Sequence, residues 1–157
     1  MPVLDILVDG TPSVEFSDWD GEIERFLELV FFDAKNQTKK IIFGQKHVPN
    51  EIREWIRNSR NSIMLDDPPE YLRNKNSLAQ AIEEFYEKSN VETIENHGDL
   101  VLNYRKSHDF RFAFRGTDIP ITVLGKTQGE YTISTINSER SLFFVKKNDL
   151  KDFLYSF

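Results

Sequence analysis

The sequence has no cysteine among its 157 residues. Disulfide bonds and thiolate chemistry are therefore excluded, and a reducing, cytoplasmic location is the natural expectation. Glycine is scarce, with seven residues, and neither a glycine-rich phosphate loop nor a Gly-x-Ser-x-Gly nucleophile elbow occurs. No apolar run approaches the roughly 18 residues that span a membrane, and the amino end lacks the basic leader of a secretory signal. These absences argue against the common enzyme classes, secretion and membrane insertion.

Basic residues are almost missing from one end of the chain. The first 34 residues hold nine acidic side chains and a single arginine, whereas the remainder carries a small excess of bases. The formal net charge of −6 therefore arises at the amino end. Such a field attracts a cationic partner and repels nucleic acid phosphates. We therefore expect a basic protein partner rather than nucleic acid or a membrane, and the sequence indicates no oligomeric state.

Length and composition predict one α+β domain over residues 1–157, since roughly 100–200 residues is typical of a single domain. Thirteen Phe, five Tyr and two Trp predict an aromatic-rich core. Helical periodicity dominates residues 1–90, short alternating runs dominate 91–146, and a terminal helix is expected over 148–157. We detect no internal repeat and no low-complexity segment.

The first half of the chain shows mainly helical spacing. A strand is expected over 3–8, a helix over 20–32 and a short strand over 39–43. The spacing i, i+3, i+4, i+7, i+8 that predicts the helix over 20–32 is formed by Ile23, Phe26, Leu27, Val30 and Phe31.

Two further helices have clear start signals. Pro49 opens one, because its missing N–H costs nothing in the first turn; Ile52, Trp55 and Ile56 give it an apolar face. Ser77 and Gln80 have the spacing of a capping box and open a helix over 78–88. The two prolines within 67–70 predict a loop between these helices.

Residues 91–146 alternate in short runs joined by turns, the last turn at 137–140. Because parallel strands need crossovers of about a dozen residues or more, short connections predict an antiparallel meander. We expect five to six strands packed against three to four helices. The expected strands are 91–95, 100–106, 110–115, 119–124, 131–136 and 142–145.

Phenylalanines alternate with other residues over 110–115, the clearest period-two pattern in the chain. If a three-residue loop joins this strand to 100–106, the aromatic side chains share one face. Arg105 then lies opposite Arg111, with Arg115 close by on the outer face. Like charges opposed across strands are destabilising, so this arginine triplet is a candidate anion site.

Two groups of arginines each have two interpretations. The triplet either binds an anion or is neutralised by an acid such as Glu92 or Glu95, and structural ion pairs are the commoner reason for clustered charge. A helical stripe, Arg53, Arg57 and Arg60, is either a phosphate-binding patch or the face that packs against the acidic segment before it. We favour the structural interpretation of both.

Three histidines and three closely spaced carboxylates are the other candidates for chemistry. The histidines lack the spacing of a zinc site, but His97 and His108 fall in predicted turns, where either could act as a metal ligand or a general base. The carboxylates could hold a divalent cation, although beside two prolines they are more simply a solvated turn. They are Asp66, Asp67 and Glu70.

The amino-terminal acids carry the main functional hypothesis. On the predicted helix, fixed carboxylates would face a basic protein, speed its association and select it, with an aromatic side chain as anchor. The expected contact set is Asp18, Trp19, Asp20, Glu22, Glu24 and Glu28.

In general character the chain is similar to bacterial immunity proteins and nuclease inhibitors, being acidic, free of cysteine and without catalytic motifs. The resemblance is one of type and implies no particular site residues. We expect a non-catalytic protein without a cofactor that occludes the cationic surface of a partner such as a toxin or a nuclease. Two alternatives stay open. One is an enzyme acting on a phosphorylated or nucleic acid substrate through the arginine triplet and a turn histidine; the other is a nucleic-acid binder that uses the helical arginines.

Overall fold

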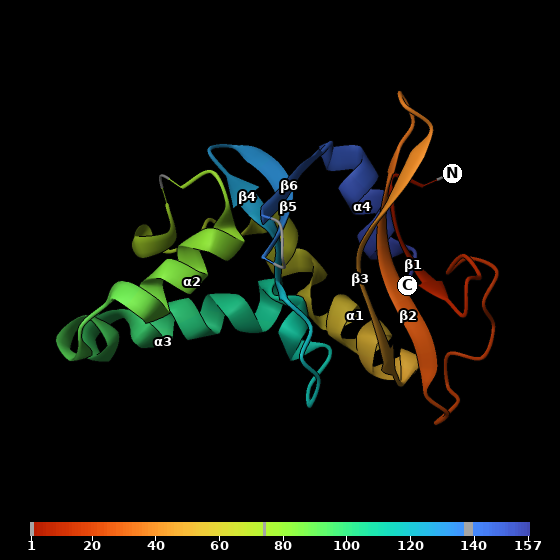
Figure 1. The fold of residues 1–157 in the computed structure, drawn as a ribbon, viewed down its shortest axis with the longest axis horizontal. Coiled ribbons are helices and arrows are strands. Elements are labelled where there is room, and N and C mark those ends of the chain that lie inside the picture. The colour runs from red at the N-terminus through yellow and green to blue at the C-terminus, as the bar shows by residue number, and fades with distance from the viewer. Residues whose placement is uncertain (1, 74, 137–139) are drawn as a thin grey trace.

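The computed structural model describes residues 2–73, 75–136 and 140–157. Over these residues the chain forms two three-stranded antiparallel sheets and four α-helices, so the predicted α+β class is confirmed (Figure 1). The predicted single meander of five to six strands is wrong, because the strands divide between two sheets and one sheet lies in the amino-terminal half. Among the described residues, no helix is both long and apolar enough to cross a bilayer.

The first sheet has the order β1-β2-β3, formed by β1 (Leu4–Val8), β2 (Arg25–Asp33) and β3 (Thr38–His47). Strands are present where they were expected over 3–8 and 39–43, the second one being longer than expected, but the helix expected over 20–32 is wrong. Leu27 and Leu29 of β2 are buried with the period of a strand and pair with β1. Two members of the expected helical stripe, Ile23 and Phe26, are exposed instead.

The two helices with clear start signals are confirmed. Helix α1 (Pro49–Leu65) begins at its proline and buries Ile52, Trp55 and Ile56. After the 3₁₀ turn η1 (Glu70–Leu72), helix α2 (Leu78–Lys88) begins as the capping box predicts, with the Ser77 hydroxyl accepting from the Gln80 N–H at 3.2 Å.

The strands and hairpin expected between residues 91 and 115 are wrong. Residues 91–108 form one helix, α3 (Val91–His108), which the Asn90 side chain caps by accepting from the Thr93 N–H at 2.8 Å. A 3₁₀ turn, η2 (Phe110–Phe112), follows. Phe110 and Phe114 are both buried. Residues four positions apart in a helical turn lie on the same side, just as alternate residues of a strand do.

The remaining strands and the terminal helix are confirmed. The second sheet has the order β4-β5-β6, formed by β4 (Ile121–Thr127), β5 (Glu130–Ile136) and β6 (Arg140–Val145), and helix α4 (Lys147–Tyr155) follows. Two residues with positive φ, Gln128 and Gly129, make the tight β4–β5 turn. The turn expected at 137–140 lies mostly outside the described residues.

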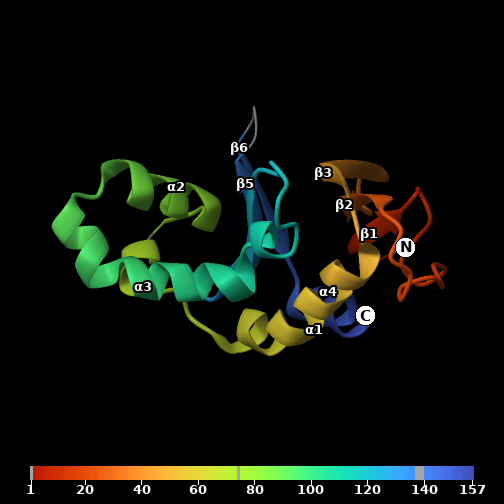
Figure 2. The same cartoon turned by 90° about the horizontal axis from the view of Figure 1, so that it is seen from below.

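Other elements lie on both sides of the second sheet, with α2 and α3 on one side and the first sheet, α1 and α4 on the other (Figure 2), and the middle residues of β4 and β5 are buried on both faces. Leu124 and Ile133 belong to a large hydrophobic cluster that also contains residues of the first sheet, α1 and α4. Val123, which points to the opposite face, belongs to a second cluster built from α2 and α3. The β4–β6 sheet therefore separates two hydrophobic clusters.

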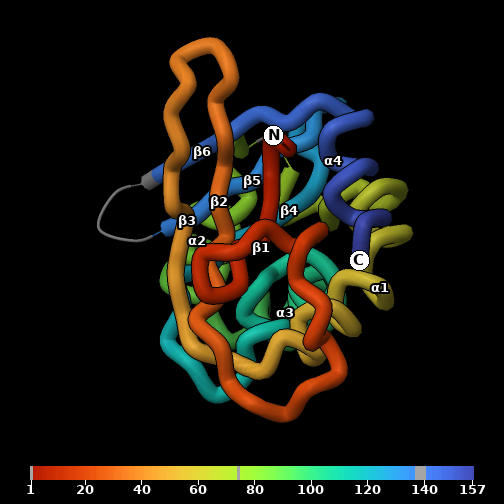
Figure 3. The backbone as a smooth tube through the Cα atoms, turned by 90° about the vertical axis from the view of Figure 1, so that its right-hand side faces the viewer, coloured from red at the N-terminus to blue at the C-terminus, as the bar shows by residue number. Residues whose placement is uncertain are grey.

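The order of elements repeats along the chain, which corrects the expectation of no repeat. Each sheet is a β-meander followed by a helix, and α1 and α4 pack side by side (Figure 3). Residues 50–56, Asn-Glu-Ile-Arg-Glu-Trp-Ile, and residues 148–154, Asn-Asp-Leu-Lys-Asp-Phe-Leu, are identical or chemically similar at every position. Both stretches start at the second residue of their helix. Along the sequence, the α2–α3 pair stands between the two βββα units.

Candidate functional site

The acidic segment forms a long loop between β1 and β2 rather than a helix. We call residues 9–24 the acidic loop. Its start is fixed by Asp5, a buried residue of β1 whose carboxylate accepts from the Ser13 hydroxyl at 2.5 Å and the Ser13 N–H at 3.3 Å. Its two ends are joined where the Asp9 carboxylate accepts from the Phe26 N–H at 3.0 Å.

Trp19 fixes the middle of the acidic loop. Its half-buried ring packs edge-to-face on Phe16, with centroids 5.1 Å apart, and on Phe157, with centroids 5.6 Å apart. The Arg53 guanidinium lies 6.0 Å from its centroid. The predicted aromatic anchor is thus already packed against other parts of the chain.

Several acids of the acidic loop pair with the protein's own arginines. Arg25 lies 3.2 Å from the Asp18 carboxylate and 3.4 Å from that of Asp9, and Arg53 of α1 pairs with Asp20. Arg53 therefore joins α1 to the acidic segment, as the structural interpretation of the helical stripe predicts. These pairs reduce the negative charge that the loop presents.

Three carboxylates of the acidic loop remain unpaired among the described residues: Glu15, Glu22 and Glu24, all exposed. Two aliphatic side chains on the same loop are also open to solvent, Val14 at 84% and Ile23 at 66% exposure. The sixth residue of the predicted contact set, Glu28, lies outside the loop, on β2.

The two other arginines of the helical stripe also contact the chain. Arg57 lies 3.4 Å from the Glu54 carboxylate, within the same helix, and the Arg60 guanidinium lies 4.6 Å from the centroid of the Tyr155 ring. Arg53 and Arg60 therefore contact other elements of the protein, whereas Arg57 is exposed and pairs only within its own helix.

The arginine triplet does not form, because residues 105–115 are not a hairpin. Arg105 lies in the last turn of α3 and donates to the Asp109 carboxylate at 3.1 Å, while the Arg111 Nε donates to the Ile119 carbonyl at 2.9 Å. Arg115 is exposed beyond η2. The acid that neutralises Arg105 is thus Asp109 rather than a residue of a neighbouring strand. Burial raises the pKa of Asp109, against the lowering effect of the Arg111 N–H and of Arg105.

His108 is a core residue and not a turn residue. It is fully buried, and its ring stacks on Tyr104 with centroids 3.8 Å apart. Its Nδ1 lies 2.8 Å from the Tyr104 carbonyl oxygen and its Nε2 lies 3.1 Å from that of Ser62. Burial lowers the pKa of the imidazole, although the two carbonyl oxygens favour its charged form. No substrate could reach this ring without opening the core.

The other predicted chemical groups lie apart. His97 is in the middle of α3 beside Tyr71, with centroids 4.3 Å apart, and the His47 Nε2 lies 2.7 Å from the Glu51 carboxylate. In the described ranges, no three His, Cys, Asp or Glu side chains are grouped to hold a metal ion. This includes the three carboxylates beside the prolines, Asp66, Asp67 and Glu70.

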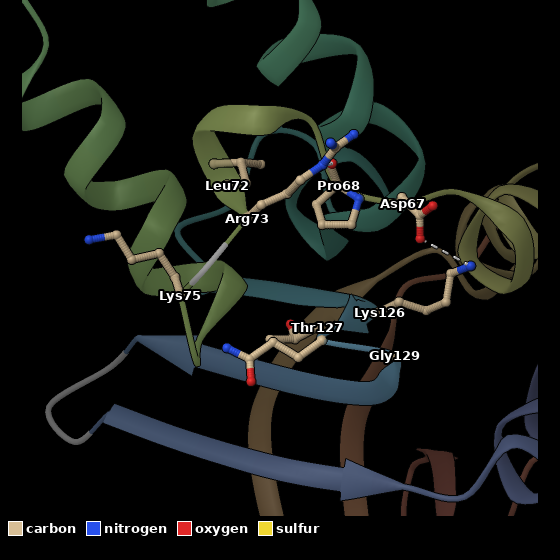
Figure 4. A pocket seen from close by; sticks show the side chains of 9 residues that line it. Asp67, Pro68, Leu72, Arg73, Lys75, Lys126, Thr127 and Gly129 are labelled. Carbon is tan, nitrogen blue, oxygen red and sulfur yellow. Dashed lines mark hydrogen bonds and ion pairs between the residues drawn. The ribbon is translucent and has the colours of Figure 1, made fainter.

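Two neighbouring cavities flank the segment that joins α1 to α2. The first, of about 330 Å³, lies between this segment and the β4–β5 turn, and we call it the cationic cavity (Figure 4). The second, of about 690 Å³, is more acidic and reaches Tyr104 of α3. The polar side chains that line the cationic cavity are Asp67, Arg73, Lys75, Lys126, Thr127 and Gln128.

Sequence reasoning missed the cationic cavity. Its cations stand at positions 73, 75 and 126, with no regular spacing, and only the fold brings the two segments together. The one local signal is the Gly129 turn, which predicts a hairpin but not what faces it.

No family model matches the chain, and neither does any curated protein or solved structure. Because a fold does not define a function by itself, the functional proposal rests on the arrangement of side chains described above.

Proposed function

We propose that this chain is a binding protein that occludes a basic surface of a partner protein with its acidic loop. The observation that carries the proposal is that Glu15, Glu22 and Glu24 are exposed and unpaired, in the described part of the chain, on a loop that its own contacts hold in place. A loop that is already ordered loses little conformational entropy when it binds.

Charge and apolar surface occur together on the acidic loop. Exposed carboxylates steer a cationic partner into encounter and select it over neutral proteins. Val14 and Ile23, both largely exposed, add the apolar area from which much of the binding free energy of an interface comes. Asp18, Trp19 and Asp20 tie the loop to the rest of the chain through their contacts with Arg25, Phe16 and Arg53.

The alternatives have less support from the geometry. An enzyme of the kind considered above needs the arginine triplet and a histidine to converge, whereas Arg105 and Arg111 bond to separate groups and His108 is buried. Nucleic-acid binding needs several free cations on α1, whereas Arg53 is largely buried and paired with Asp20, and Arg60 lies over the Tyr155 ring, which leaves Arg57 as the one exposed arginine of the stripe.

The test is retention of basic proteins by the immobilised chain in a lysate of its source cells. The loop variant Glu15→Lys/Glu22→Lys/Glu24→Lys is compared with the control Glu87→Lys/Glu95→Lys/Asp99→Lys, which changes the net charge equally at exposed positions of α2 and α3.

We expect a basic protein to be retained by the wild type and the control, lost by the loop variant, and released as salt is added. Equal retention by the loop variant, or retention of proteins that are not basic, would contradict the proposal.

A further inference from the structure

The outer face of the first sheet is open. Leu27 and Leu29 of β2 belong to the large hydrophobic cluster, so strand alternation places Phe26 and Glu28 on the opposite, outer face. That face is turned towards the viewer in Figure 3, where the helices lie beside or behind the sheet. Phe26 is therefore an aromatic side chain, 42% exposed, on a sheet face that the described helices leave uncovered.

The Phe26 ring is positioned by a glycine on the edge strand β3. A Cβ atom added at Gly44 would lie 2.6 Å from the Phe26 Cζ and 3.3 Å from its Cε1. A larger residue at position 44 would displace the ring, whereas glycine lets the tip of the ring rest on the backbone of β3. Because the ring is already ordered, it loses little conformational entropy when a partner contacts it.

The Glu28 side chain stands next to this ring. Glu28 lies directly opposite Gly44 in the β2–β3 register, and the Cα atoms of residues paired in this way are about 5 Å apart. The ring tip and the Glu28 carboxylate thus occupy neighbouring places on one face. Glu28 is half-buried, and its carboxylate has no partner among the described residues. Lys46, opposite Phe26 on the same face, is exposed and does not pair with it.

We propose that Phe26 and Glu28 together bind an arginine side chain of the basic protein partner, a proposal that rests on the protein-binding function above. A guanidinium is planar and carries its donors at the edge, so it can stack on an aromatic ring and donate to a carboxylate at the same time. A lysine ammonium is a strongly hydrated point charge that matches the carboxylate better than the ring. The acidic loop ends two residues before Phe26 and would bring a cationic partner to this face.

The test is an NMR titration of the ¹⁵N-labelled full chain with two blocked peptides, tri-arginine and tri-lysine, at constant ionic strength. With tri-arginine we expect saturable shifts at the amides of Phe26, Glu28 and Gly44. Tri-lysine is expected to bind about threefold more weakly at these amides, since its ammonium groups do not stack on the ring.

Variants separate the ring from the charge. Phe26→Leu keeps an apolar side chain over Gly44 and is expected to remove the preference for tri-arginine. Phe144→Leu is its matched control, because Phe144 is an exposed phenylalanine of the second sheet. Glu28→Gln is expected to weaken the binding of both peptides at these amides about fivefold, since it removes a charged acceptor. Glu130→Gln, which changes an exposed glutamate of β5, is expected to leave binding unchanged. The spectrum of each variant also reports whether it is folded.

Four results would overturn the proposal. They are the absence of saturable shifts at the three amides, equal affinity of the two peptides for the wild type, an unchanged preference for tri-arginine in Phe26→Leu, and an unchanged affinity in Glu28→Gln. Each can occur while the acidic loop still retains a basic protein, so failure here is distinguishable from failure of the protein-binding function itself.

Discussion

The contact between Tyr104 of α3 and Gly125 of β4 yields a quantitative prediction. The Tyr104 hydroxyl is buried and has no hydrogen-bond partner among the described residues. Burial raises the pKa of Tyr104, so the hydroxyl stays protonated. A Cβ atom added at Gly125 would lie 2.3 Å from the Tyr104 Oη, and 3.1 and 3.3 Å from atoms of Leu78 and His108. Only glycine fits beneath this hydroxyl.

The two single substitutions are expected to act in opposite directions. Tyr104→Phe removes an unsatisfied polar group from the interior and is expected to raise the free energy of unfolding by about 1 kcal/mol. Gly125→Ala inserts a methyl group into a filled space and is expected to lower it by about 1–3 kcal/mol. The ring cannot turn aside easily, because it is stacked on His108.

The double variant isolates the contact. In the Tyr104→Phe background the atom nearest to the new methyl group is gone, and the contacts with Leu78 and His108, at 3.1 and 3.3 Å, remain tight. Gly125→Ala is therefore expected to cost about 1 kcal/mol less than in the wild type, a coupling typical of residues in contact. Urea denaturation of the four proteins measures it. Additive effects, or a strongly destabilising Tyr104→Phe, would refute this description of the interface between α3 and the second sheet.

Two further predictions concern the helices that cover the second sheet. Burial lowers the pKa of His108 below its ordinary value of about 6.5, so the unfolded chain binds a proton at a higher pH than the folded one. The free energy of unfolding is therefore expected to fall as the pH drops below 6.5 towards the folded-state pKa. Urea denaturation at several pH values measures this fall, which is expected to be smaller for His108→Gln. Equal dependence on pH in the wild type and the variant would contradict the prediction. Ser77→Ala removes the cap of α2 and is expected to lower the free energy of unfolding by about 1 kcal/mol, and thermal unfolding indistinguishable from the wild type would show that the cap is not needed.

The parts of the fold that sequence predicted correctly have local causes. A proline at a helix start and a capping serine act through their own backbone neighbourhood, so α1 and α2 begin where Pro49 and Ser77 indicate. The Gly129 turn likewise defines the β4–β5 hairpin from two residues. Such signals do not depend on the rest of the chain.

The wrong predictions occur where apolar spacing fits two structures. Residues 25–33 satisfy helical spacing, but they also alternate, and pairing with β1 decides for the strand. Over 91–108 the turn-like sequence around Gly98 suggested a break between strands, whereas the Asn90 cap and the buried Val101, Tyr104 and His108 belong to one helix. A cap at Asn90 was visible in the sequence and would have favoured the helix.

The candidate sites were less predictable than the fold. The excess of acids in the first 34 residues is visible in the sequence, but which of them stay free depends on Arg25 and on the distant Arg53. The cationic cavity depends on two segments some 50 residues apart, so no spacing rule could indicate it.

The repeated βββα order has a consequence for how the chain can come apart. Ile52 and Ile56 in the first unit and Leu150 and Leu154 in the second contribute to the same hydrophobic cluster. Phe31 of one unit stacks on Phe143 of the other, with centroids 4.8 Å apart. Each half thus completes the interior of the other, much as two subunits do in an obligate dimer, and the α2–α3 pair is the tether between them. A cut within that tether should leave two fragments that are soluble as a pair and unstable when separated.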